Sequence, residues 1–183
     1  MAKNSIGLIE LTSIAAGFQV CDAMLKTADV DVVLSRSICS GKYMVMIRGD
    51  VAAVQSSVSA GLSCGHFSVI DSFVIPNLHE AVFPAIAGSN KVEVMNALGI
   101  VESFSVASLI EGADAAVKTA NVELIEIRLA MALGGKAFAT MTGDVAAVQS
   151  AVDAAAAVVG QRGMLVNKVV IPHPRPELLN EMI

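Results

Sequence analysis

The strongest constraint on this chain is an internal repeat. Residues 49–56, which read Gly-Asp-Val-Ala-Ala-Val-Gln-Ser, return unchanged as residues 143–150. Three further matches flank this tract: Gly7–Glu10 with Gly99–Glu102, Lys26–Ala28 with Lys118–Ala120, and Val74–Pro76 with Val170–Pro172. The spacing is 92 residues at the first of these matches and 96 at the last, which suits a small domain and is too long for a solenoid repeat. The sequence therefore predicts two homologous domains.

The boundary between the two copies is expected at a short polar tract. Ala87-Gly88-Ser89-Asn90 is the only stretch of small, polar residues between them. We therefore expect a first domain at residues 1–90 and a second at 91–183. Two similar domains joined by a short link can replace two subunits of a ring, so three chains would imitate a hexamer.

The composition favours an oligomer and excludes several classes of partner. The chain is 55% hydrophobic and only 4% aromatic, so its core must be aliphatic, and the apolar excess suggests that neighbouring subunits cover part of the surface. The net charge is −5 without a cluster of Lys or Arg, which argues against nucleic acid as a partner. We expect neither a membrane span nor a secretion signal.

The cysteines point to a reducing compartment. Cys21, Cys39 and Cys64 all lie in the first copy, and the second copy has none. An odd number without matching partners is not typical of a disulfide framework.

Each copy predicts the same order of elements, βαββαβ. Strands are expected at 5–11, 31–37, 42–48 and 67–75 in the first copy, and at 98–103, 123–129, 136–142 and 164–171 in the second. One helix follows the first strand of each copy, and an alanine-rich helix precedes the last. The prediction is an α+β fold in which two helices cover an antiparallel sheet.

The helix signals name specific caps and a core face. Ser13 and Ser105 are expected to cap the first helix of each copy, and Asp50 and Asp144 the second. In the first helix, Phe18, Cys21, Leu25 and Ala28 recur with helical spacing, which predicts that this stripe faces the core.

Several of these residues resemble a known family. Lys26-Thr27-Ala28-x-Val30, the Gly-Asp-Val-Ala-Ala-Val-Gln tract and the Val-Ile-Pro ending, present in both copies, resemble the shell-protein domain of bacterial microcompartments. The resemblance implies two tandem ferredoxin-like shell domains and a homotrimer that forms a pseudohexameric disc. It also implies a place in a cytoplasmic microcompartment shell, other shell proteins as partners, and positions for Lys26 and Lys118 at the oligomer edge.

One loop is similar to that of a smaller group in this family. Ser37-Ile38-Cys39-Ser40-Gly41-Lys42 is similar to the Thr-Ile-Cys-Pro-Gly-Lys loop of tandem shell proteins that carry an iron–sulfur cluster in propanediol-utilisation compartments, with Ser40 in place of Pro. The resemblance implies that the loop lines a central pore. It further implies that Cys39 of three chains binds one [4Fe–4S] cluster, with an encapsulated or cytosolic redox protein as partner.

The residues themselves leave alternatives open. One thiolate cannot hold a cluster, and no CxxC spacing exists within the chain, so the residues by themselves favour a metabolite pore without a cluster, in which Cys39 is a small pore residue. A trimeric small-ligand sensor that uses clefts between subunits is a further alternative. Lys26 and Lys118 follow Asp22 and Asp114 by four residues, so each pair is also explained by a surface ion pair. Neither a catalytic triad pattern nor a phosphate-binding loop is present, so we expect no enzyme.

Overall fold

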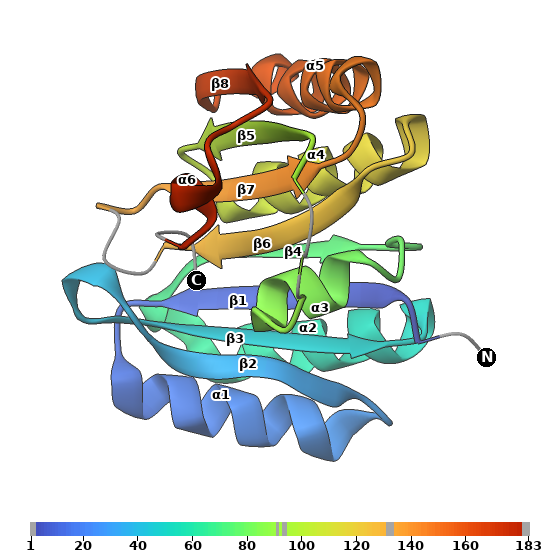
Figure 1. The fold of residues 1–183 in the computed structure, drawn as a ribbon. Helices are drawn as coiled ribbons and strands as arrows, with labels where there is room; N and C mark the ends of the chain where they lie inside the picture. The colour runs from blue at the N-terminus through green and yellow to red at the C-terminus, as the bar shows by residue number, and fades with distance from the viewer. Residues whose placement is uncertain (1–2, 91, 93–94, 131–133, 181–183) are drawn as a thin grey trace. The chain divides into compact units, whose positions relative to one another are not determined.

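The computed structural model describes residues 3–90, 92, 95–130 and 134–180 (Figure 1). Backbone contacts divide the chain into two compact units, Met1–Leu78 and His79–Ile183. The division lies before the tract at which the sequence places the end of the first copy, because helix α3 (Val82–Ala87) packs against strand β6 and helix α4 of the second unit.

The first unit is a four-stranded sheet with two helices. Its strands have the order β2-β3-β1-β4, and each neighbouring pair is antiparallel. Helices α1 and α2 pack against each other and cover one face of the sheet (Figure 1). The elements are β1 (Ser5–Leu11), α1 (Ile14–Thr27), β2 (Asp31–Ile38), β3 (Lys42–Gly49), α2 (Val51–Gly65) and β4 (Val69–Ile75), with short 3-10 turns at Cys39–Gly41 and His66–Ser68.

The second unit repeats this architecture. Its sheet has the order β6-β7-β5-β8, again with antiparallel neighbours. A register shift interrupts the edge pair at Val32/Leu34 in the first unit and at Leu124/Glu126 in the second, which are equivalent positions of the repeat. The elements are α3, β5 (Ala97–Ser103), α4 (Val106–Thr119), β6 (Glu123–Leu129), β7 (Ala137–Thr142), α5 (Val145–Gln161), β8 (Leu165–Pro172) and α6 (Pro176–Asn180). The predicted α+β fold is confirmed, and the short helices α3 and α6 add to it.

All four predicted residues occupy the N-cap positions of their helices, and three of them make a side-chain cap hydrogen bond. The hydroxyl oxygens of Ser13 and Ser105 accept the backbone N–H groups of Ala16 and Ser108 at 3.3 and 3.2 Å. Asp50 accepts the N–H of Ala53 at 2.8 Å, which satisfies a donor that the helix itself leaves unpaired. Asp144 occupies the N-cap position of α5, as predicted, but its side chain makes no cap hydrogen bond there.

The predicted core face of α1 is wrong by one residue. Gly17, Val20 and Met24 are buried, whereas Phe18 and Leu25 are exposed. The helix carries apolar residues on two faces, and periodicity alone does not say which of them meets the sheet. Gly17 determines which face is buried, because α1 lies against the ring of Tyr43 at this position.

Candidate functional site

The loop that contains Cys39 is the end of a tight hairpin. Ile38 pairs with Lys42 in the β2–β3 register, so only Cys39, Ser40 and Gly41 connect the two strands. Gly41 has a φ of +72°, and a Cβ at this glycine would meet no atom within 4 Å. Glycine is therefore needed for its left-handed backbone rather than for space, as is usual in three-residue hairpin loops.

The side chains of the hairpin differ in burial. Ile38 is buried and anchors the end of β2, Ser37 and Gly41 are exposed, and Cys39 is partly buried. The side chain of Ser40 lies outside the described part of the structure. The hairpin thus presents one thiol near its tip, on a backbone that two strands hold.

Lys42 is engaged by a carboxylate. Its Nζ lies 2.8 Å from Oε1 of Glu10, and the glutamate side chain is only 18% exposed. The second unit repeats the pair, with Lys136 Nζ at 2.5 Å from Glu102 Oε1. Lys42 begins the third strand of its unit and Lys136 directly precedes the third strand of the other, so each pair joins the first strand of a unit to this end of the third, and both glutamates have a structural role. The ammonium group of Lys42 is therefore paired with the carboxylate of Glu10.

Cys39 is the one cysteine of this hairpin. Among the described residues, no group of three or more Cys, His, Asp or Glu is placed to hold a metal ion. Cys21 and Cys64 pack against the core of the first unit, which gives both of them packing roles. A thiolate is the ligand that iron–sulfur clusters use, but a cluster needs several of them. The donor set therefore fits a cluster shared between chains and does not fit a cluster held by one chain.

The loop of the second unit differs. There the chain from Ala130 to Gly135 reads Ala-Met-Ala-Leu-Gly-Gly, two residues longer and without a cysteine. Residues 131–133 lie outside the described residues. The N–H of Ala130 donates to the carbonyl of Lys136 at 3.2 Å, which closes the loop at its base.

Lys26 and Lys118, the lysines expected at the oligomer edge, occupy equivalent exposed positions. Lys26 and Lys118 lie in the last turns of α1 and α4, where a cation suits the helix dipole. Their Nζ atoms lie 2.6 and 2.5 Å from the carboxylates of Asp22 and Asp114. The ion pairs predicted from the four-residue spacing are therefore present, and they hold both ammonium groups at the helix surface.

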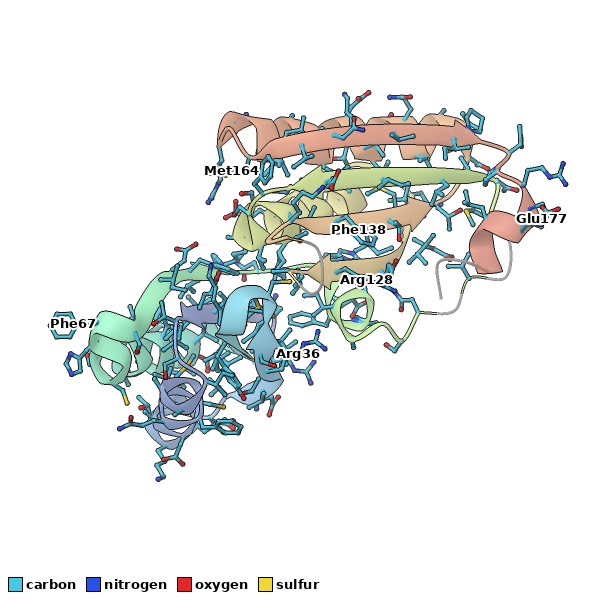
Figure 2. The ribbon with its side chains drawn as sticks, turned by 90° about the vertical axis from the view of Figure 1, so that its left-hand side faces the viewer. Arg36, Phe67, Arg128, Phe138, Met164 and Glu177 are labelled. Carbon is cyan, nitrogen blue, oxygen red and sulfur yellow. The ribbon has the colours of Figure 1, made fainter. Side chains whose placement is uncertain are left out.

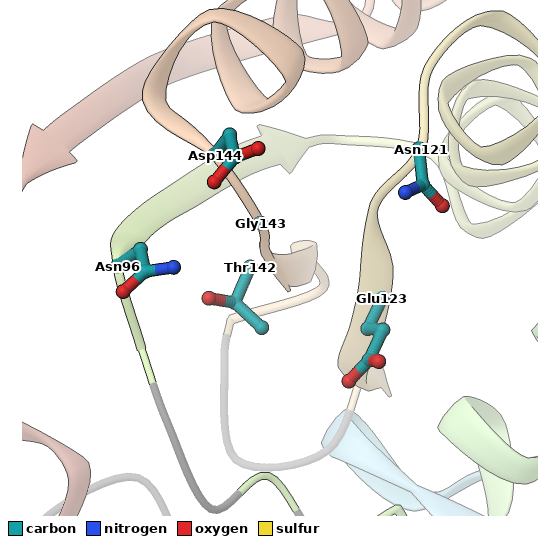
Figure 3. Close-up of a pocket in the computed structure, with 6 residues that line it drawn as sticks. All are labelled: Asn96, Asn121, Glu123, Thr142, Gly143 and Asp144. Atoms are coloured by element: carbon teal, nitrogen blue, oxygen red, sulfur yellow. The ribbon is translucent and has the colours of Figure 1, made fainter.

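A small polar cavity was not predicted from the sequence. It encloses about 240 Å³ at the start of α5 and is lined by Asn96, Asn121, Glu123, Thr142, Gly143 and Asp144 (Figure 3). In the first unit, Arg48 stands where Thr142 stands in the second, and it pairs with Asp31 at 3.5 Å. Lys3 also pairs with Asp31, at 3.4 Å. The two copies of the repeat differ at this position, with Arg48 in the first and Thr142 in the second, and this difference is the sequence signal that could have pointed to the cavity.

Within the described residues, no helix combines the length and apolarity needed to cross a bilayer.

Comparison with known proteins identifies the family. The model of the BMC domain matches residues 5–78 and again residues 97–174. The chain is 45% identical to the bacterial microcompartment shell protein PduT of Citrobacter freundii over 181 residues, which cover 99% of this chain and 98% of the relative. A crystal structure of a microcompartment protein from Desulfitobacterium hafniense DCB superposes with a TM-score of 0.94 at 52% identity, covering 98% of this chain and 99% of that one. The shell protein EutM of Salmonella typhimurium, by contrast, matches 46% of this chain with 85% of its own length, at 43% identity. The chain therefore belongs to the BMC domain family, as a tandem-domain microcompartment shell protein.

Proposed function

We propose that this shell protein assembles as a homotrimer, a pseudohexameric tile with one [4Fe–4S] cluster on its threefold axis. Cys39 of each of the three chains binds the cluster. The group supplies one-electron transfer, and the tile passes electrons across the shell to a redox protein on the other side.

The observation that carries this proposal is the single thiol at the tip of the β2–β3 hairpin. A trimer with this hairpin at its axis would bring three such thiols together, and their thiolates would hold the cluster. The second copy of the repeat has no cysteine in its loop, so only three of the six loops in a trimer carry a donor. The likeness of residues 37–42 to the loop of cluster-carrying shell proteins supports the same assignment.

The lysines support the tile. Lys26 and Lys118 recur in both copies at the ends of equivalent helices, with exposed ammonium groups. In a disc of six domains this places a lysine on every domain. We propose that these six groups contact neighbouring tiles.

Anaerobic purification tests the proposal. Light scattering should give the mass of a trimer, and iron and sulfide analysis should give about four of each per three chains, with visible absorption typical of a [4Fe–4S] cluster. A monomer at all concentrations would contradict the tile. Four irons per single chain would contradict the shared site.

A metabolite pore without a cluster is the second candidate. Ser37 and Gly41 are exposed beside Cys39, so the same hairpins would line an opening with small polar groups. A trimer that contains neither iron nor sulfide after anaerobic purification from iron-supplemented cells would favour this function. The sensor alternative needs clefts between subunits, whereas the polar cavity found here is lined by residues of the second unit alone.

A further inference from the structure

Helix α1 and strand β2 present an exposed apolar face. Phe18 is 64% exposed, Val32 is 42% exposed, and Ile14 and Leu25 are exposed beside Phe18 on α1. Phe67, the most exposed aromatic residue, instead projects from the short turn that follows the first unit's second helix (Figure 2). The α1–β2 face combines several large apolar side chains from two elements, which is typical of a covered surface.

The equivalent face of the second unit is buried. Ile110 matches Phe18 in the repeat and is 0% exposed, and Leu124 matches Val32 and is 2% exposed. Val106, which matches Ile14, is buried as well. The two faces therefore have the same apolar character but differ in whether something covers them.

The segment that follows the first copy binds the second unit at this face. Helix α3 packs against β6 and α4. At the start of the segment, the backbone N–H of His79 donates to Oδ1 of Asp114 at 2.7 Å, and at its end Nδ2 of Asn90 donates to the carbonyl of Leu124 at 2.7 Å. Between these two bonds, Val82 of α3 is completely buried.

The segment that follows the second copy is built in the same way. Asn77 and His173 directly follow the matching prolines and share a positive φ, of 57° and 47°. Counting from them, Arg175 matches His79 and Leu178 in α6 matches Val82. Yet Leu178 is 37% exposed, and the side chain of Arg175 is 84% exposed. At the position of Val82 this segment therefore has an apolar residue, Leu178, without the burial.

The charges at the face agree with this correspondence. Asp114 uses one carboxylate oxygen for Lys118 and the other for the N–H of His79, and its side chain is 16% exposed. Asp22 holds Lys26 through Oδ2 in the same manner, but its side chain is 61% exposed. An arginine at the position of His79 complements that carboxylate.

We propose that residues 173–180 of one chain bind the α1–β2 face of a neighbouring copy, with Arg175 at Asp22 and Leu178 against the apolar face. The segment after each copy then covers the next copy along the ring, within the chain at one junction and between chains at the other. This inference rests on the proposed trimer. It adds the contact that closes the ring.

A disulfide test distinguishes the partners. In a background of Cys21→Ala, Cys39→Ser and Cys64→Ser, we would introduce Asp22→Cys with Arg175→Cys. Mild oxidation should give covalent dimers and trimers on a non-reducing gel. The matched control is Asp114→Cys with His79→Cys in the same background, where the hydrogen bond places the bridge inside one chain and only a monomer band is expected.

Mixed chains identify the contact as intermolecular. Coexpression of a chain with only Asp22→Cys and a chain with only Arg175→Cys should give covalent dimers that contain one of each. A trimer by light scattering whose Asp22→Cys/Arg175→Cys form stays uncrosslinked, or crosslinks within one chain, would overturn the contact and leave the trimer standing. Loss of the trimer in the unmodified protein would overturn both.

A second variant needs no oxidation. Leu178→Asp changes an exposed position, so each chain should fold, but the trimer should dissociate at a protein concentration at least tenfold higher. Met164→Asp is the control, because Met164 is equally exposed at 38% and lies before β8 (Figure 2). Equal dissociation of the two variants would overturn the proposal.

Discussion

Gly17 and Tyr43 share one space between helix α1 and strand β3. A Cβ at Gly17 would lie 2.1 Å from Cδ1 of Tyr43, so the buried ring requires glycine opposite it. In the second unit the same two positions hold Leu109 and Ala137, both buried. The large residue has moved from the strand to the helix. Both units thus pack a helix against a strand at this contact, but the large side chain comes from the strand in the first unit and from the helix in the second.

This exchange predicts a strong coupling between the two positions. Tyr43→Ala should lower the free energy of unfolding by about 3 kcal/mol because it leaves a cavity. Gly17→Leu should lower it by about 2 kcal/mol because it overpacks the contact. The double variant, which installs the pair of the second unit, should lose at least about 1 kcal/mol less than the sum. Urea denaturation at a fixed protein concentration measures all three, and strict additivity would contradict the interpretation.

The helix caps predict an asymmetry between the copies. Asp50→Ala removes the bond to the N–H of Ala53 and should cost about 1 kcal/mol of stability. Asp144→Ala removes no such bond and should cost less than half as much. Asp50→Ser keeps an acceptor at the cap and should restore most of the loss. Thermal unfolding followed by circular dichroism gives the comparison, and equal losses at the two aspartates would argue against it.

The cysteines predict which substitution removes the cluster. Cys39→Ser should abolish iron, sulfide and visible absorption while the trimer remains, because the hairpin is held by its strand pairing. Cys21→Ser and Cys64→Ser are the controls, since both residues pack against the core, and each variant should retain the cluster. Iron analysis and light scattering on all three proteins provide the measurement. Full iron content in the Cys39→Ser protein would contradict the cluster site and would favour a role for Cys39 as a pore-lining residue.

The lysines predict a defect in tiling without a defect in folding. Lys26→Asp with Lys118→Asp should leave trimers intact, because each i,i+4 pair contributes only about 0.3 to 0.5 kcal/mol and the new like charges cost a similar amount. Sheets of tiles seen by electron microscopy should disappear. Lys168→Ala is the control, because it breaks another exposed ion pair, with Asp153 at 2.6 Å, away from the helix ends. If the double variant forms sheets as regular as those of the unchanged protein, the two lysines have no role in tiling and are only charges on the helix surface.

The sequence by itself determined the local and the repeated features. The duplicated tracts predicted two units with one element order, and both units have it. The caps at Ser13, Ser105 and Asp50 and the ion pair of Lys26 with Asp22 also followed from spacing, because each joins groups within one helical turn. Such contacts depend on the chain's immediate neighbours and are readable in the order of residues.

Only the tertiary structure decided which surfaces meet. Periodicity marked Phe18 and Leu25 as core residues, but the shape of Tyr43 and of α2 placed Gly17 and Val20 there instead. The contact between the two helices of each unit also exchanges a small and a large residue. A Cβ at Gly65 would lie 3.3 Å from Val20 in the first unit, and a Cβ at Gly112 would lie 3.0 Å from Val159 in the second. Each small residue fits only its large partner from a distant part of the chain. Because close packing depends on the volumes of both sides together, no single stretch of sequence contains the answer.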